Sequence, residues 1–352
     1  MELDMHFYGI YALARAAGVK PEIAKIIAYS SQFVDDSIED EAIILNDQSA
    51  IIPTMTSHKP IDYQNTIPGD QWRVWVPFHF LPGNDSTART FVEKMVCTKN
   101  STPAQQILKF ALKLREEVLG PHLAGIVAHV YADTFSHYGF SGLSNEGNKV
   151  KNDSIKIYVK SRKISNYVTS KAEKFFTKIS GVFVESVCPV GHGAVATYPD
   201  RPYLHWEYEY ESGKKAERKN MEDFTEACRL LHGFFSEFIK DNALYGDPLK
   251  LVSWNLIHKK IKNILKQEEP MVNRIKLWKD AISSTKLFEV IEEDKDIKYS
   301  KEDWGSDSIV RHFAKSGTVD NCDGCLFIRA SWKYRNYVID ELLPAISLTI
   351  AL

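Results

Sequence analysis

The segment AGIVAHVYADTFSHYGFSG, residues 124–142, gives the strongest signal in the chain. Between Glu117 and Glu146, Asp133 is the only Asp, Glu, Lys or Arg, so a helix over residues 121–138 is apolar almost all round. Such a helix is buried on every side. A carboxylate inside it is costly unless it is paired or bound to a cation. The segment therefore predicts a central helix that carries a polar site.

Two histidines flank this carboxylate at helical spacing. His129, Asp133 and His137 occupy positions i, i+4 and i+8, which places them in one stripe that drifts by about 80° around a helix. Imidazole and carboxylate groups together suit Zn, Mn or Fe better than Ca or Mg alone. The alternative is a buried hydrogen-bonded network without a metal. The lack of any other charge on the helix favours metal binding.

The sequence on both sides of this helix is mostly helical as well. Apolar spacing and boundary residues predict further helices over residues 4–17, 21–36, 86–97, 103–119, 166–184, 221–242, 249–267, 270–292 and 326–348. Short β-like runs, among them RVWVPFHF at residues 73–80, indicate a small β or irregular insertion at about 41–82. A short strand is expected at 155–159, and residues 289–307 are expected to form a surface linker.

Composition sets the class of protein. The 352 residues carry 46 acids and 44 bases, which excludes a generally basic nucleic-acid binder. Five scattered cysteines argue against a disulfide-stapled module. An acidic N-terminus and the lack of a long uncharged apolar stretch predict a cytoplasmic protein without an integral membrane segment. We predict a mainly α, multi-helix single domain over residues 1–352, with a helical C-terminal part over 215–352; the oligomeric state stays open.

Further candidate ligands lie before the central helix. His6 lies at the start of the first predicted helix, and Asp35 and Asp36 end the second. Paired carboxylates repel each other unless a cation joins them. His79 lies in an uncharged run, where a histidine is either a satisfied core residue or a ligand.

One candidate ligand lies in a loop after the central helix. His192 is flanked by Gly191 and Gly193, which permit a close backbone approach. Loops carry function more often than their share of the chain. We therefore favour His192 as a ligand, with Asp200 as a weaker candidate and His205 as a substrate-side or surface residue.

The order of these ligands resembles that of the zinc-dependent phospholipase C and P1-type nuclease superfamily. Members of that superfamily are all-α proteins with three clustered metal ions that hydrolyse phosphodiesters. The resemblance covers about residues 4–200. It implies one metal held by Asp36 (or Asp35), His79, His129 and Asp133, a second bridged by Asp133 and contacted by His6, and a third held by His137 and His192.

The chain departs from that pattern at three points. The gap before His137 is shorter than usual, and the acidic partner expected four residues after His192 is replaced by Ala196. Secreted members use the mature N-terminal amine as a ligand, whereas this chain begins MELDMHF. The helical, metal-dependent HD superfamily is a competing resemblance, but no adjacent His-Asp pair occurs in the chain.

These patterns predict a metal-dependent hydrolase of phosphoesters, acting on a nucleotide, nucleic acid or phospholipid through metal-activated water. Two or three divalent transition-metal ions are expected, with Zn favoured over Mn or Fe. Whichever of Asp35 and Asp36 is not a ligand is expected to act as general base or to orient a metal-bound histidine. The cluster Lys160, Arg162 and Lys163 is expected to attract the phosphate.

Two other functions stay open on the sequence. One is an HD-like di-iron or di-manganese oxidoreductase, and the other is a non-catalytic sensor or interaction protein in which metals only join helices. Cys322 and Cys325 form a C-x2-C pair without a second pair or a paired histidine motif. Such a pair is half of a redox or metal site, or incidental.

Overall fold

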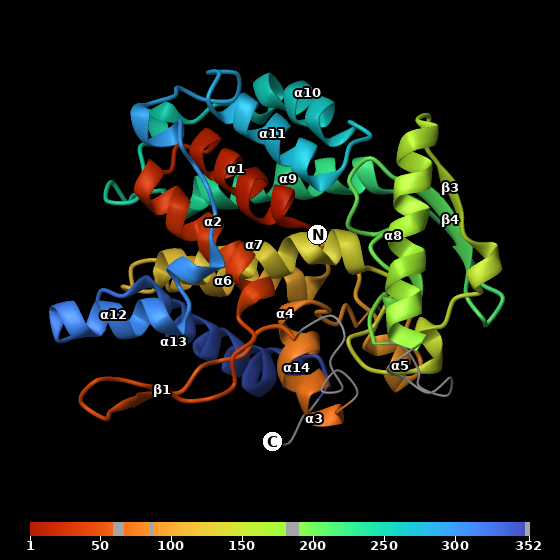
Figure 1. Cartoon of the computed structure of the whole chain (residues 1–352), viewed down its shortest axis with the longest axis horizontal. Coiled ribbons are helices and arrows are strands. Elements are labelled where there is room, and N and C mark those ends of the chain that lie inside the picture. Colours follow the sequence, from red (N-terminus) through yellow and green to blue (C-terminus); the bar gives the residue numbers. More distant parts are fainter. Residues whose placement is uncertain (59–66, 85–86, 181–189, 349–352) are drawn as a thin grey trace.

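The computed structural model describes residues 1–58, 67–84, 87–180 and 190–348. Over these residues the protein is mainly α-helical, which confirms the predicted fold class. Helix α7 (Gly120–His137) lies at the centre, and all its residues are buried. The helices α2 (Pro21–Asp36), α6 (Thr102–Lys113), α9 (Asn220–Phe238) and α13 (Asp323–Asn336) pack around it (Figure 1). The buried helix predicted over residues 121–138 is therefore confirmed, and the structure places it at the centre.

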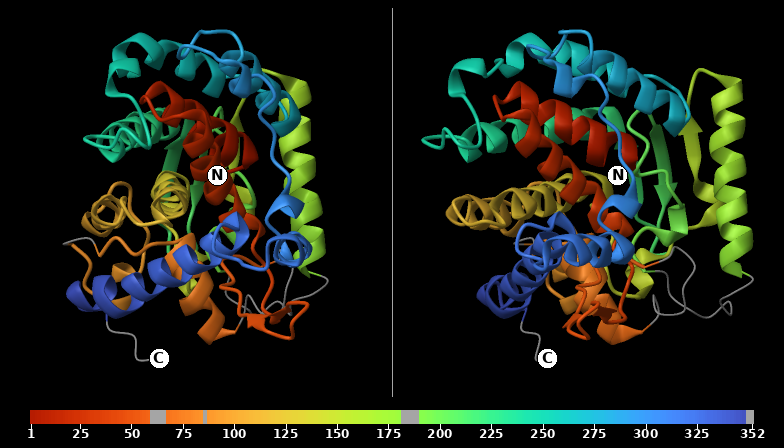
Figure 2. Two further views of the ribbon diagram at one scale, coloured as in Figure 1. Left: turned by 90° about the vertical axis from the view of Figure 1, so that its left-hand side faces the viewer. Right: turned by 60° about the vertical axis from the view of Figure 1, so that its left-hand side comes forward.

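The N-terminal segment is part of the core. A π-helical turn, Asp4–Gly9, leads into α1 (Ile10–Ala16), and both are completely buried. The chain start lies inside the molecule in all three ribbon views (Figures 1 and 2). Arg274 of α11 (Met271–Ile282), itself 1% exposed, donates from Nε to Oδ2 of Asp4 at 2.8 Å. This buried ion pair fixes the N-terminal turn against α11.

The surface linker expected at 289–307 is wrong for part of its length. The carboxylate of Asp294 is completely buried and accepts hydrogen bonds from Arg15 at 2.7 Å and Tyr11 at 2.6 Å. Trp304 is buried in the helical core. A buried guanidinium needs an acidic partner, so this acidic segment supplies one instead of remaining in water.

A three-stranded antiparallel sheet forms a second layer. Its order is β3-β4-β5, with β3 (Lys156–Tyr158) in place of the strand expected at 155–159, and with β4 (His205–Glu209) and β5 (Lys215–Lys219) not predicted. The strands lie between the helical core and α8 (Arg162–Ser180) in Figure 2. Trp206 of β4 is completely buried in a second apolar cluster beneath α8.

The expected β insertion at 41–82 is only partly β. An antiparallel ribbon pairs β1 (Ile43–Ile44) with β2 (Ala50–Ile51), while residues 59–66 lie outside the described residues. The run RVWVPFHF, predicted as β, is helical instead. Its residues 73–78 belong to a π-helical turn (Gln71–Trp75) and to α4 (Val76–Phe78), which follow the short α3 (Pro68–Asp70). Val74 and Phe78, four residues apart, are both buried, and this tertiary packing overrides the β propensity of the run.

Most of the remaining helices differ from prediction at their ends, whereas α12 (Ser306–Ser316) was not predicted. The helix expected at 86–97 shortens to α5 (Phe91–Lys94), which begins with a capping box of Thr90 and Glu93. The last helix begins earlier, at Asp323, and is followed by further helical turns. The other bounds are α10 (Trp254–Leu265), a π-helical turn over Tyr337–Leu342 and α14 (Leu343–Ala345). In the part of the chain that the structure describes, no helix has the length and apolar character to cross a membrane.

Candidate metal centre

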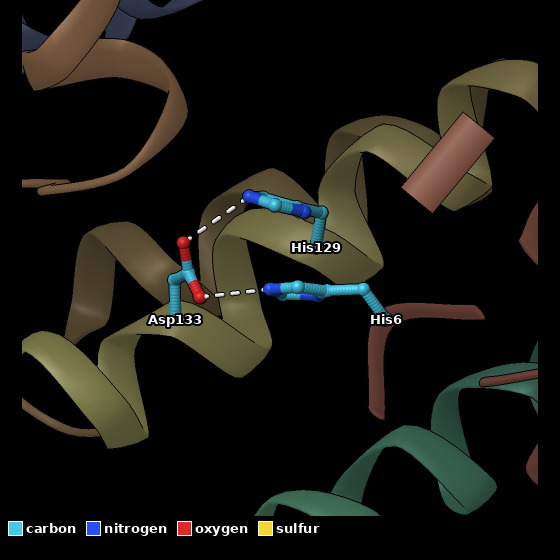
Figure 3. Close-up of side chains that lie close together, drawn as sticks. All are labelled: His6, His129 and Asp133. Carbon is cyan, nitrogen blue, oxygen red and sulfur yellow. Dashed lines mark ion pairs between the residues drawn. The ribbon is translucent and has the colours of Figure 1, made fainter. Parts of the chain in front are cut away.

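Asp133 lies at the centre of a group of histidines. Its carboxylate is 1% exposed, with Oδ1 3.2 Å from Nε2 of His6 and Oδ2 3.1 Å from Nε2 of His129 (Figure 3). Oδ2 also lies 3.4 Å from Nδ1 of His79 and 3.5 Å from Nδ1 of His137. The rings of His6 and His129 stack with their centroids 3.8 Å apart. Segments far apart in sequence therefore converge on the one acid of the central helix.

Backbone carbonyl groups fix the orientation of four histidine rings. The pairs are His129 Nδ1 with Ser31 O at 2.7 Å, His79 Nε2 with Thr56 O at 2.9 Å, His137 Nδ1 with His79 O at 2.8 Å, and His192 Nδ1 with Ala196 O at 2.7 Å. A carbonyl only accepts, so the ring nitrogen that faces it carries the proton. The other nitrogen of each neutral ring is then a lone pair. This is how proteins orient metal-binding histidines.

These lone pairs face carboxylates. In the neutral tautomer, Nε2 of His129 is an acceptor and so is the carboxylate of Asp133 that it faces. The same holds for Nε2 of His192, 3.6 Å from Oδ2 of Asp200, and for Nε2 of His137, 3.4 Å from Oδ1 of Asp200. Neither His6 nitrogen has a hydrogen-bond partner among the described residues, although both are buried. Acceptors that converge in a buried space need a cation between them, either protons or a metal ion.

The ligand atoms fall into three groups, each with its atoms within 4.8 Å of one another. Site A is Asp35, His79 and His129; site B is His6, His129 and Asp133; site C is His137, His192 and Asp200. Because Ser31 holds one nitrogen of His129, the other can serve only one ion, in site A or in site B. Asp133 presents a different oxygen to each of these two sites and so can bridge them.

The protonation of the central groups suits metal ligands. Burial would raise the pKa of Asp133, but the charges of His137, the Met1 amino group, His129 and His6 lower it well below its usual value. The carboxylate is therefore ionised at neutral pH, the form that a metal ion requires.

The outer groups of the cluster also have the protonation states that metal ligands need, except for Asp35. Burial lowers the pKa of His6 well below its usual value and that of His192 to about 4, so both rings are neutral at pH 7. Burial opposes ionisation of Asp200, but the Met1 amino group and His192 lower the pKa of Asp200 well below its usual value. Loss of hydration raises the pKa of Asp35, despite the nearby histidines. A bound cation would favour the ionised form of Asp35.

The Met1 amino group lies among these carboxylates. It is 2.7 Å from Oδ1 of Asp133 and 3.3 Å from Oδ1 of Asp200. Burial lowers the pKa of this amino group, but the charges of Asp133, Asp200 and Asp35 outweigh burial and raise it to about 11. Ser136 of α7 donates a hydrogen bond of 2.6 Å to the same Asp200 oxygen. The Asp200 carboxylate is thus fixed from the central helix.

Two local features hold α7 in the position that the cluster requires. Gly125 permits the close approach of α2, because a Cβ at this position would overlap the carbonyl oxygen of Ile27 and lie 2.5 Å from Cβ of Ser30. This contact brings the Ser31 carbonyl to His129. At the other end of α7, Arg218 donates to the carbonyl oxygen of Ser136 at 2.6 Å, which satisfies a helix-terminal acceptor.

A cavity of about 810 Å³ opens onto the cluster. Asp35, His79, Asp133, His137, His192 and Asp200 all line it. Much of the remaining wall is apolar, with Trp75, Phe80, Phe175 and Phe176 among its residues. The cluster is therefore accessible to a small molecule, whereas a purely structural site would be closed by protein ligands.

The structure brings six of the seven predicted metal ligands together: His6, His79, His129, Asp133, His137 and His192. The seventh, Asp36, lines the cavity but belongs to none of the three sites. Its Oδ2 accepts hydrogen bonds from Tyr299 at 2.7 Å and Gln32 at 3.1 Å. Asp35 supplies the carboxylate of site A instead. Helix phase could have shown this, because Asp35 lies four residues after Ser31 and on its face of α2. Asp200, the weaker candidate, fully joins site C.

The predicted phosphate-binding cluster lies elsewhere. The side chains of Lys160, Arg162 and Lys163 are exposed and are not part of the described cavity wall. Lys149, from the same basic stretch, does line the cavity. His205 is 40% exposed and pairs with Glu217 in the neighbouring strand, which is consistent with a surface residue.

Comparison with known protein families matches residues 1–342 to a family of unknown function, DUF6765. The chain belongs to this family. No curated protein and no solved structure matches the chain. The function of this DUF6765 protein has therefore to be inferred from the chemistry of its own residues.

Proposed function

We propose that this protein is a metal-dependent hydrolase of small phosphoesters. The observation that carries the proposal is the convergence of sites A, B and C at the wall of one accessible cavity, with Asp133 between sites A and B. Adjacent cation sites, two of them joined by a shared carboxylate, suit a reaction in which negative charge moves between two oxygens. The order of the ligands along the chain resembles that of the zinc-dependent phospholipase C and P1-type nuclease superfamily, which supports the same reaction class.

The residues present divide the work between binding and orientation. Divalent ions, when bound, lower the pKa of a bound water to about 7 and polarise phosphoryl oxygens. His79, His129, His137 and His192 are held by carbonyls in the orientation that ligation needs. Mixed imidazole and carboxylate ligands favour Zn, with Mn or Fe as alternatives.

Asp36 is the remaining acid at the cavity and is proposed to orient the attacking water. Its Oδ2 is fixed by Tyr299 and Gln32, while the carboxylate also lines the cavity beside Asp35. Nearby carboxylates and burial raise the pKa of Tyr299, so its hydroxyl stays protonated and continues to donate to Asp36. A fixed carboxylate next to a site that binds water is well placed to accept a hydrogen bond from that water.

The cavity wall indicates the kind of phosphoester. The wall offers apolar and aromatic surface from Trp75, Phe80, Phe175 and Phe176. Among the described residues of the wall, Lys149 is the single Lys or Arg. A long polynucleotide would need an extended positive groove. A small phosphoester that carries an apolar or aromatic group fits this wall better.

The test combines metal analysis with a substrate screen. The full-length protein, tagged at the C-terminus, is purified gently and its metal content is measured by mass spectrometry. Bis-p-nitrophenyl phosphate and p-nitrophenyl phosphate are then assayed with added Zn or Mn, against the variant Asp133→Asn. Asp47→Asn, in the exposed turn that joins β1 to β2, is the matched control for loss of a carboxylate.

We expect more than one transition-metal ion per chain and turnover that Asp133→Asn removes and Asp47→Asn retains. Less than one ion per chain would contradict the metal centre itself. Full metal content without turnover of either ester would contradict the hydrolase and would leave a metal-binding protein.

A further inference from the structure

A second reactive group lies away from the metal cluster, at the start of α13. Cys322 is the N-cap residue, with a non-helical backbone (φ −91°, ψ 112°), and Cys325 is the third residue of the helix. Side chains at these two positions lie over the same first turn, where reciprocal contacts form in a capping box. The geometry of the helix start therefore makes the two thiols neighbours.

Tight packing holds this helix start in place. Cys322 is 7% and Cys325 4% exposed, and both pack with Ile309 in a small apolar cluster. Between them, Gly324 leaves no room for a side chain, because a Cβ would lie 2.7 Å from the carbonyl oxygen of Trp304. The C-x2-C spacing is thus kept in one geometry by contacts on both sides.

The chemistry of the two thiols differs. A hydrogen bond from the Cys325 thiol, with a contribution from the His312 imidazole, lowers the pKa of the Cys322 thiol to about 6. The same interaction and burial raise the pKa of the Cys325 thiol. One partner is therefore a thiolate at neutral pH and the other holds its proton, which suits stepwise exchange. Burial raises the thiol pKa of both Cys97 and Cys228, which are inert by comparison.

We propose that Cys322 and Cys325 form a redox-active dithiol that closes reversibly to a disulfide. In the first step the Cys322 thiolate attacks one sulfur of a low-molecular-weight disulfide such as oxidised glutathione, and one thiolate leaves. In the second step the Cys325 thiol loses its proton to solvent and attacks Sγ of Cys322, and the second thiolate leaves. Two electrons pass from the pair to the external disulfide, which becomes two thiols.

The position of the pair connects it to the core. Asp323, between the two cysteines, lies 3.1 Å from Nε2 of His122, near the start of α7. Helix α13 also packs against α7. The dithiol therefore lies at the opposite end of α7 from His137, and it includes no ligand of sites A, B and C. The proposal does not rest on the hydrolase activity.

The test titrates the full-length protein with defined mixtures of reduced and oxidised glutathione. Exchange is stopped with acid, the free thiols are then alkylated with iodoacetamide in denaturant at mildly alkaline pH, and all five cysteines are mapped by peptide mass spectrometry. We expect a reversible loss of two hydrogens within one peptide that contains both Cys322 and Cys325. Cys97→Ser is the matched control and should behave like the unaltered protein.

Single serine variants distinguish the order of attack. Cys325→Ser should accumulate a mixed disulfide with glutathione at Cys322, whereas Cys322→Ser should stay largely unmodified at Cys325. Circular dichroism and metal content, unchanged in both, show that the variants fold. Complete alkylation of both thiols in every glutathione mixture would overturn the proposal, as would a disulfide that excess dithiothreitol does not reduce or a metal ion held by the two thiols.

Discussion

Replacing Asp133 with Asn tests whether one carboxylate joins the metal sites. The amide keeps the shape of the side chain but removes the charge that faces His6 and His129. Site B would lose its carboxylate, and site A would keep Asp35, His79 and His129 without the bridging charge. Site C contains no Asp133 and should keep its ion.

The size of the effect follows from linkage. An ion present at about 100 times its Kd adds about 2.7 kcal/mol of stability. With an unfolding entropy of about 2.1 cal/mol/K per residue, 352 residues convert 1 kcal/mol into a Tm change of about 1.4 °C. Three filled sites would thus raise Tm by about 11 °C above the chelated protein. Loss of the bridging charge should weaken site A by about 100-fold, the upper end of the range for outer partners, which leaves site A about half filled.

The assay compares metal stoichiometry and metal-dependent Tm in Asp133→Asn and Asp200→Asn. We expect about one to one and a half ions in Asp133→Asn, with a metal-dependent rise in Tm of about 4 °C, because a half-filled site adds only about 0.4 kcal/mol. Asp200→Asn should lose only site C, and should keep about two ions and a rise of about 7 °C. If Asp133→Asn keeps three ions, Asp133 does not bridge. If both variants lose the same ions, site C is not separate.

Three further changes test the surroundings of the cluster. Arg274→Met leaves the buried carboxylate of Asp4 without its partner and should lower the free energy of urea unfolding by about 3–5 kcal/mol. The double variant with Asp4→Asn should regain part of this loss. Equal stability of the single and the double variant would refute the ion pair. The pKa of His192 is about 4 in the folded chain and about 6.5 in the unfolded chain, so the metal-free protein should lose stability as the pH falls from 6.5 to 4. In His192→Gln, the free energy of unfolding, measured by denaturant titration at each pH, should depend less steeply on pH. Gly125→Ala places a methyl group against the carbonyl oxygen of Ile27 and should lower both Tm and metal affinity, and an unchanged Kd by metal titration would show that α2 does not position the cluster.

The central helix and most ligands could be predicted because their signals are local. An uncharged run around Asp133 indicates burial, and the spacing of His129 and His137 follows directly from helix geometry. Most flanking helices were predictable for the same reason, although their boundaries differ by several residues. The helical conformation of residues 71–78 could not be predicted, because their β-branched and aromatic side chains favour a strand. Burial of Val74 and Phe78 in the core overrides this local preference.

The rest of the site depends on contacts between distant segments. Asp200 follows His192 in irregular backbone, so no period relates the two residues. Contacts with the distant Ser136 and the Met1 amino group place the carboxylate at the cluster. The carbonyls that orient the histidines carry no sequence signature, since any residue has one. Ala196, whose side chain cannot replace the expected acid, contributes its carbonyl oxygen to His192 instead.

The arrangement of acceptors explains why sites A and B should fill together. The Met1 amino group fixes both Asp133 and Asp200, Ser136 also fixes Asp200, and neutral imidazoles face both carboxylates. The first divalent ion would separate acceptors that otherwise oppose each other and would hold Asp133 in place for its neighbour. Each later ion then binds a carboxylate that is already ordered, at a lower cost in conformational entropy. Repulsion between adjacent ions opposes this gain, and it is smallest where a carboxylate lies between them, as Asp133 does between sites A and B.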